Sequence, residues 1–205
     1  MRLFYTPGTV SIAAAIALEE AGLTYEPELV NFAKAEQTQP PYLAINPKGR
    51  VPALAVGDTI LTETGAILDY IAAIAPEARL VPDDPIAAAH MRSVMYYLAS
   101  TMHVNHAHKM RGHRWADSPD SHADMTAKVT ETMTASAQFL EDTALLGDYV
   151  CGDALSIGDA YLFIVCTWLP GDGVALSDFP IINAFMDRMN ARASVQEARA
   201  KGMLR

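Results

Sequence analysis

The chain has 205 residues, 51% of them apolar, which is enough to bury a hydrophobic core as one domain or as two small ones. Its formal net charge of −9, from 15 basic and 24 acidic residues, excludes a broad basic surface, so neither nucleic acid nor a membrane is expected as a partner. Two cysteines, Cys151 and Cys166, are too few for a disulfide framework and favour a reducing cytoplasm.

The beginning of the chain alternates short strands with helices. A strand is expected at Arg2–Tyr5, a helix at Ser11–Ala21 and a second strand near Glu28–Val30. In "VPALAVGDTILT", residues 51–62, the letters VGD separate two short apolar runs as a hairpin turn does. A helix is expected to follow at Glu63–Ala75, so the order is βαβ and then ββα.

The apolar pattern changes near "APEARLVPDDP", residues 75–85, where prolines and acidic residues interrupt any regular element. We therefore expect an α/β domain over residues 1–76, a linker over 77–85 and an all-helical domain over 86–205. The helical domain is predicted to begin with one long helix over Ile86–Trp115, with Gly112 as a candidate bend.

Two further segments of the second half carry helical signals. In "SIGDAYLFIVCTWL", Ser156 is placed to cap a helix, and Asp159 lies in its first turn. Pro180 is expected to begin another helix. The segment that precedes these two has an apolar residue about every four positions, which predicts another helix. These residues are Met125, Val129, Met133, Ala137 and Leu140.

Three stretches of the chain carry a family resemblance. "NPKGRVPALAVGDTILTETGAILDYI", residues 46–71, resembles the glutathione-binding core of the glutathione transferases. "FYTPGTVSIAAAIALEEAG", residues 4–22, resembles the first strand and helix of the bacterial beta-type members, and "CGDALSIGDAYLF", residues 151–163, is similar to the family's helical-domain capping motif. The resemblance covers essentially the whole chain and implies a thioredoxin-like N-terminal domain followed by an all-α C-terminal domain.

The resemblance also implies where glutathione would bind. It makes the Val51–Pro52 bond cis, so that the Val51 backbone pairs with the cysteinyl unit of the peptide. Thr64, where the family usually has serine, and the helix amides around it would take the γ-glutamyl carboxylate, while Glu63 takes the ammonium. Without the neighbouring motif, the letters TET at residues 62–64 would indicate only a good helix cap. The terminal glycine carboxylate is expected near one of three cations, Lys34, Arg50 or Lys48.

A free thiol with a pKa near 8.5 is only about 3% ionised at pH 7, so such a protein must stabilise the thiolate. A hydroxyl donor can do so, and the candidates are Tyr5, Thr9 and Ser11. Beta-type relatives usually carry cysteine where this chain has Val10, which argues against thiol–disulfide chemistry there. Two alternatives stay open: Tyr5 packs its ring in the core, or Ser11 only caps the helix.

The stretch "MHVNHAHKMRGHRW", residues 102–115, gathers histidines and cations in an otherwise acidic chain. By alignment His103 matches a histidine that lines the sulfur site of beta-type relatives. The alternative is a solvated helix face. No metal site is expected, because zinc needs three or four ligands and nothing clearly completes a set. The candidates for contact with a second substrate are His106, Met110, Arg111 and Arg114.

These observations predict a cytoplasmic glutathione transferase of detoxification type, with glutathione as co-substrate and no metal. The thiolate would attack a small apolar or partly anionic electrophile, and the resemblance implies a homodimer. Two alternatives remain: a glutathione-dependent peroxidase or isomerase, and a non-catalytic glutathione-binding or dimerisation module. The absence of cysteine at Val10 is the best support for the last of these.

Overall fold

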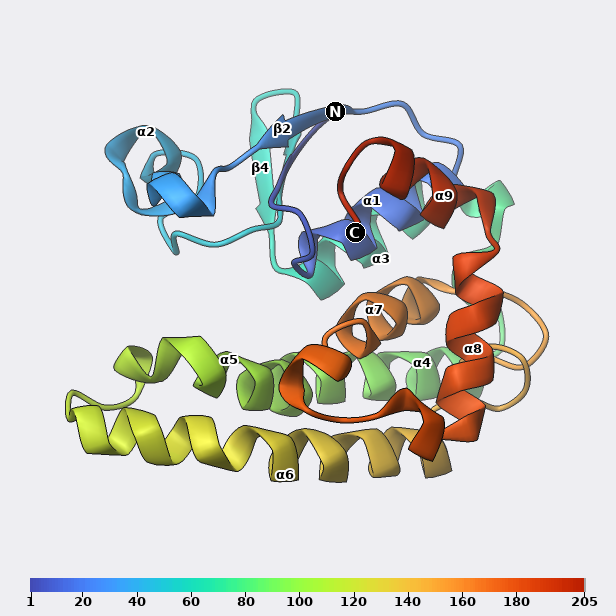
Figure 1. The fold of residues 1–205 in the computed structure, drawn as a ribbon. Helices are drawn as coiled ribbons and strands as arrows, with labels where there is room; N and C mark the ends of the chain where they lie inside the picture. Colours follow the sequence, from blue (N-terminus) through green and yellow to red (C-terminus); the bar gives the residue numbers. More distant parts are fainter. Residues whose placement is uncertain (205) are drawn as a thin grey trace. The chain divides into compact units, whose positions relative to one another are not determined.

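In the computed structural model, which describes residues 1–204, four short strands form a mixed sheet (Figure 1). The strand order is β2-β1-β3-β4, with β1 parallel to β2 and the other neighbours antiparallel. Each strand was expected from the sequence within a few residues. Their bounds are β1 Arg2–Tyr5, β2 Glu26–Leu29, β3 Ala53–Val56 and β4 Thr59–Thr62.

Helix α1 (Ser11–Glu20) is buried along almost its whole length, with every residue from Ser11 to Leu18 at most 1% exposed. Such burial requires apolar side chains around the full circumference, and the sequence "SIAAAIAL" supplies them. Helix α1 contacts β1, α3 (Thr64–Ile74) and α9 (Ala193–Ala200). Helices beside a small mixed sheet make this the predicted thioredoxin-like α/β fold.

The chain divides into two compact units. The first combines Met1–Pro82 with the final segment that begins at Met189, and the second is Asp83–Arg188. In the first unit α9 lies beside α1 (Figure 1), and Arg192 forms a two-pronged ion pair with Glu20 at 2.6 and 2.7 Å. Burial raises the pKa of Glu20, but the hydrogen bonds and charge of Arg192 and the Ser194 hydroxyl outweigh it, and the net shift is downward.

The second unit consists of helices, as predicted for the all-α part of the fold. Helices α5 and α6 run side by side, and α4 packs on α7 (Figure 1). The helices from α4 onward are α4 Pro85–Tyr97, α5 His103–Arg111, α6 Pro119–Thr143, α7 Ile157–Cys166 and α8 Pro180–Asn190. Shorter pieces elsewhere are α2 Pro40–Leu43 and the 3₁₀ turns Phe32–Lys34, Glu36–Thr38, Pro76–Ala78, Gly112–Arg114, Pro170–Asp172 and Leu176–Asp178.

The chain is helical over nearly the whole range predicted for one long helix, residues 86–115, but the type of helix changes along it. A π-helical turn, Leu98–Met102, separates α4 from α5. Within it the Ser100 hydroxyl donates a 2.8 Å hydrogen bond to the Tyr96 carbonyl, the kind of side-chain bond that bends helices. The bend expected near Gly112 is present, because α5 ends at Arg111 and a 3₁₀ turn follows.

No helix among residues 1–204 combines the length and the apolar character needed to cross a membrane.

The start of α7 is held by the buried carboxylate of Asp159, as its place in the first turn indicated. This group accepts hydrogen bonds of 2.7 Å from the Ser156 amide, 2.8 Å from the Ser156 hydroxyl and 2.8 Å from the Val150 amide. The first of these bonds is half of a capping box, and in the other half the Ser156 hydroxyl accepts from the Asp159 amide. Asp159 is therefore a structural acid that fixes the loop before α7 to the helix.

We expect this acid to make stability depend on pH. Burial raises the pKa of Asp159 to about 6, against the lowering effect of its hydrogen bonds, whereas the unfolded value is near 3.9. The folded protein therefore binds the proton more tightly, and this stabilisation, full below about pH 4, is lost as the pH rises through about 6. Urea unfolding of the wild type and Asp159→Asn should show their difference falling by up to about 3 kcal/mol over that range. A difference independent of pH would contradict the shift.

Candidate functional site

The junction between β1 and α1 is organised by Thr6, a residue that the sequence analysis did not single out. The Thr6 hydroxyl donates to the Val30 carbonyl at 2.7 Å, and its amide donates to the Ser11 hydroxyl at 3.2 Å. The Thr6 carbonyl accepts from the Thr9 hydroxyl at 2.8 Å. The only signal in the sequence for this role of Thr6 was that it adds a fourth hydroxyl to the short stretch "YTPGTVS", residues 5–11.

The three candidate hydroxyls have different environments. Ser11 is fully buried, and its oxygen lies 2.7 Å from that of Thr9. Thr9 is half-buried, and its hydroxyl is committed to Thr6 and Ser11. Tyr5 is also half-buried, and its hydroxyl makes no hydrogen bond with any other described residue. Of the three, Tyr5 has the proton that is not already used within residues 1–204.

The alternative that Ser11 merely caps α1 does not match the geometry. The N-cap of α1 is Val10, which is 5% exposed, and no side chain caps the helix there. Just before it, Gly8 has φ 69°, a left-handed conformation that favours glycine. Its amide donates a 2.9 Å hydrogen bond to the carbonyl of Met203, so the final segment holds this loop.

The segment before β3 presents an unpaired stretch of backbone. The Val51–Pro52 bond is cis, as the resemblance implied. Among the described residues, neither the amide nor the carbonyl of Val51 has a hydrogen-bond partner. The preceding carbonyl, that of Arg50, is fixed by 2.7 Å bonds from the Tyr42 hydroxyl and the Asn46 side-chain amide. Burial raises the pKa of Tyr42 to about 12, so the phenol keeps the proton that it donates.

At the start of α3 the backbone is strained and the helix amides are uncapped. Glu63 occupies the N-cap with φ 72° and ψ 124°, a combination rare for any residue except glycine, and no side chain caps the helix. Thr64 is 7% exposed, and its hydroxyl makes no hydrogen bond with other described residues. The free amides and this hydroxyl favour an anion here.

Lys48 lies beside this helix start. Its ammonium is 2.5 Å from a Glu63 carboxylate oxygen and 2.8 Å from the Thr62 hydroxyl. The two other cations suggested for the glycine carboxylate, Lys34 and Arg50, are exposed, Lys34 in a 3₁₀ turn and Arg50 next to Val51. The structure therefore pairs Lys48 with the acid proposed for the ammonium.

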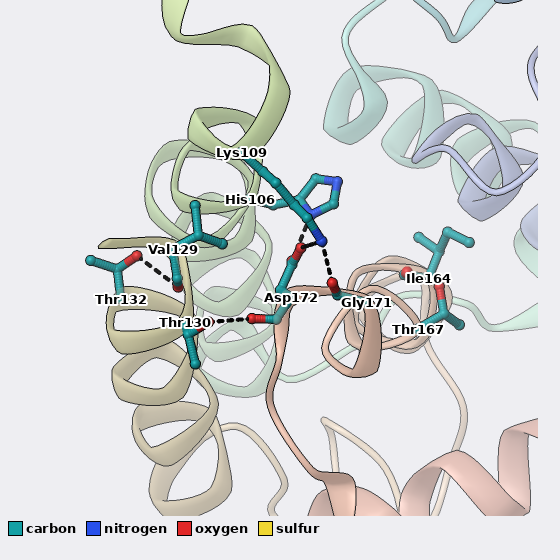
Figure 2. Close-up of polar contacts among 9 residues, drawn as sticks. All are labelled: His106, Lys109, Val129, Thr130, Thr132, Ile164, Thr167, Gly171 and Asp172. Carbon is teal, nitrogen blue, oxygen red and sulfur yellow. Dashed lines mark hydrogen bonds and ion pairs between the residues drawn. The ribbon is translucent and has the colours of Figure 1, made fainter. Parts of the chain in front are cut away.

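In the second unit, two of the predicted histidines flank one indole. The ring of His103 meets that of Trp168 edge-on at 5.0 Å between centroids, and the ring of His106 stacks on it at 4.4 Å. His106 also contacts the buried Asp172, with Nδ1 2.6 Å from a carboxylate oxygen (Figure 2). The sequence analysis named neither Trp168 nor Asp172 as a partner of these histidines, because both lie more than sixty residues further along the chain.

The other second-substrate candidates are more dispersed. Met110 is 83% exposed, Arg111 is half-buried and Arg114 is exposed in the 3₁₀ turn after α5. Within residues 1–204, no group of three or more histidine, cysteine, aspartate or glutamate side chains is arranged to hold a metal ion.

Comparison with protein-family models identifies both parts of the chain. Residues 1–73 match the model "Glutathione S-transferase, N-terminal domain", and residues 92–193 match "Glutathione S-transferase, C-terminal domain". These matches agree with the thioredoxin-like sheet, the helical unit and the geometry around Val51. It belongs to the glutathione S-transferase family.

Individual relatives agree with this assignment. Glutathione S-transferase GstA of Escherichia coli O157:H7 is 33% identical over 97% of this chain and 96% of its own length. Maleylacetoacetate isomerase of Pseudomonas aeruginosa is 29% identical over 97% of this chain and 95% of its own length. A crystal structure of a glutathione transferase homolog from Sulfitobacter with bound glutathione is 64% identical, with a TM-score of 0.98 over 99% of this chain and 98% of that one.

We expect the two donors that fix the Arg50 carbonyl to stabilise the first unit unequally. Tyr42→Phe removes one hydrogen bond and should lower the free energy of unfolding by about 1 kcal/mol. Asn46→Ala should lower it by about 2 kcal/mol, because Asn46 also accepts from the Lys48 amide at 3.2 Å. Urea unfolding provides the measurement. Tyr96→Phe is the control. Tyr96 is 66% exposed, so the loss of its hydroxyl should change the free energy of unfolding by less than about 0.5 kcal/mol. A Tyr42→Phe variant as stable as the control would contradict the role.

Proposed function

We propose that the protein transfers alkyl or aryl groups to the sulfur of glutathione. Glutathione is bound by the first unit, and a small apolar or partly anionic electrophile is bound by side chains of the helical unit. The single observation that carries the proposal is the unpaired Val51 backbone a short distance along the chain from the uncapped start of α3. Glutathione offers one group to each: a peptide unit to Val51 and a carboxylate to the helix amides.

Charge supports the orientation of the γ-glutamyl end. The amides at the start of α3 and the Thr64 hydroxyl suit its carboxylate, and the Glu63 carboxylate suits its ammonium. Glu63 already holds one ammonium, that of Lys48, at 2.5 Å. The ammonium of glutathione would therefore either join Lys48 as a second cation beside Glu63 or displace Lys48 from Glu63. A displaced Lys48 is available to the glycine carboxylate, together with Arg50 or Lys34.

The hydroxyl environments support a specific donor for the thiolate. Ser11 is fully buried, and both its proton and that of Thr9 have partners within the loop. Tyr5 lies at the end of β1 with an unengaged hydroxyl. We therefore assign sulfur activation to Tyr5, and we assign to Thr9 and Ser11 the role of shaping the loop. Bringing thiolate and electrophile together would then supply the remaining catalysis.

Isomerisation is the second candidate, because a relative of nearly full-length coverage is named maleylacetoacetate isomerase. A binding module without catalysis is the third, supported by the valine at position 10. In each case glutathione is the shared ligand. A homodimer in the cytoplasm, the arrangement implied by the resemblance, is part of the proposal.

The activation of sulfur can be tested by titrating glutathione bound to the protein and following the ultraviolet absorbance of the thiolate. The wild type should lower the thiol pKa below about 8.5. Tyr5→Phe should return it upward by about one unit or more, because one hydrogen bond to a charged group contributes about 1.5 to 3 kcal/mol.

Thr9→Val and Ser11→Ala are the matched controls, and each should move this pKa less than Tyr5→Phe does. A larger shift in either control would reassign the donor, and no shift in all three would exclude a hydroxyl donor. If the wild type binds glutathione saturably but leaves the pKa of its thiol unchanged, the result would favour the binding module without catalysis.

The γ-glutamyl site can be tested by Glu63→Gln, which removes the charge and keeps the shape. We expect the dissociation constant of glutathione to rise about tenfold, since a charge-assisted bond to the ammonium is lost. Isothermal titration calorimetry at fixed ionic strength measures it. Glu77→Gln makes the same change of charge at an exposed acid of the first unit and should leave the affinity unaltered. Equal affinities for the two variants would contradict this site.

A further inference from the structure

The segment after α9, residues 201–204, returns to the loop that connects β1 to α1. The amide of Gly8, in the middle of that loop, donates a 2.9 Å hydrogen bond to the carbonyl of Met203. Met203 is fully buried. Both residues belong to the first compact unit, although the whole helical unit lies between them in sequence. The loop before α1 is therefore completed by residues from the other end of the chain.

A helix C-cap of defined geometry directs Met203 to this loop. Two residues after α9, Gly202 has φ 70°. Its amide donates to the Arg199 carbonyl at 2.9 Å. The next amide, that of Met203, donates to the Ala198 carbonyl, also at 2.9 Å. These bonds form a Schellman motif, in which a left-handed residue, usually glycine, reverses the chain after a helix. Gly202 thus sets the direction in which Met203 leaves α9.

Helix α9 itself is fixed to α1 by charged groups. The ion pair between Arg192 and Glu20 is joined by the Ser194 hydroxyl, which donates to Glu20 at 2.5 Å. The Lys201 ammonium lies 2.5 Å from a carboxylate oxygen of Glu19. These contacts hold α9 along α1 (Figure 1), so the turn after α9 has a fixed place relative to that helix.

The bond from Gly8 restrains the loop in a way that its internal bonds do not. Thr6 and Thr9 bond to each other across the loop, whereas the bond to Met203 ties the loop to another segment. Gly8 is exposed and has φ 69°, and glycine populates many conformations. The bond to Met203 therefore removes freedom that the loop would otherwise keep.

We propose that Gly202 and Met203 are positioning residues of the glutathione site. They keep the loop after Tyr5 in one conformation before the ligand arrives, so that the sulfur of glutathione meets the Tyr5 hydroxyl without first ordering the loop. Pre-organisation of this kind raises affinity, because less conformational entropy is lost on binding. This inference rests on the proposed function and adds the final segment of the chain to its site.

A matched pair of glycines provides the test. Gly22 ends α1 with the same motif, since it has φ 64° and the Leu23 amide donates to the Leu18 carbonyl at 3.0 Å. At Gly22 and at Gly202, an added Cβ would have no heavy atom within 4 Å apart from those of adjacent residues. Valine strains the backbone at both positions, because a β-branched residue is strongly disfavoured in the left-handed region. Only the change at Gly202 disturbs the contact with the loop before α1.

We expect Gly202→Val to raise the dissociation constant of glutathione about tenfold and to move the pKa of the bound thiol upward. Calorimetry measures the first and thiolate absorbance the second. Gly22→Val should lower the urea midpoint of unfolding by a similar amount, yet leave both values unchanged. Hydrogen exchange of the Gly8 amide, followed by NMR without glutathione, should be faster in Gly202→Val and close to the wild-type rate in Gly22→Val. Met203→Leu keeps the carbonyl and a buried apolar side chain, so it should behave as the wild type.

A chain that ends at Lys201 is the second variant if Gly202→Val does not fold. It keeps the ion pairs of α9 and lacks Met203, and the same changes in affinity, thiol pKa and Gly8 exchange are expected. Equal glutathione affinities in the two valine variants, or an unaltered thiol pKa or Gly8 exchange in Gly202→Val, would overturn the inference and leave the proposed function intact. A wild type that does not bind glutathione, or that binds it without lowering the thiol pKa, would overturn both.

Discussion

The burial of α1 on every side is the constraint on which the first unit depends. Its alanines let the helix approach β1, α3 and α9 closely, and fully burying each larger side chain, such as Ile12, Ile16 or Leu18, contributes about 1.5 to 3 kcal/mol. A helix confined in this way has a fixed start. The loop that connects it to β1 must therefore turn within a few residues, and the hydrogen bonds of Thr6 and the left-handed Gly8 make that turn possible.

The ligand recognition that we propose for the first unit relies on backbone groups that buried side chains hold in place. Tyr42 and Asn46 fix the Arg50 carbonyl, and the next residue, Val51, is left with unpaired polar groups. At α3 the strained conformation of Glu63 leaves the helix amides uncapped. Both arrangements leave hydrogen-bonding capacity unused by the protein itself, a common feature of binding sites. The charged side chains nearby then add orientation to affinity.

In the helical unit, the contacts that we propose for the second substrate come from side chains instead. The π-helical turn Leu98–Met102 ends where α5 begins, so it sets the direction in which His103 and His106 project. The apolar spacing predicted one long helix but not the π-helical turn within it, where the Ser100 hydroxyl donates to the Tyr96 carbonyl. The partners of His106 come from a turn after α7, and their identity depends on how α5 and α6 pack against that turn.

The sequence by itself determined the order of strands and helices, the thioredoxin-like fold and the family, because these depend on apolar periodicity, turn residues and short motifs that are local in the chain. The alanine-rich "SIAAAIAL" predicted a helix, and "VGD" predicted the hairpin. Tertiary structure alone decided that Ser11 is buried while Tyr5 keeps an unengaged hydroxyl, that α9 packs on α1, and that Asp172 orients His106. These outcomes depend on contacts between residues far apart in sequence, and no local pattern records which polar groups will find a partner when the chain folds.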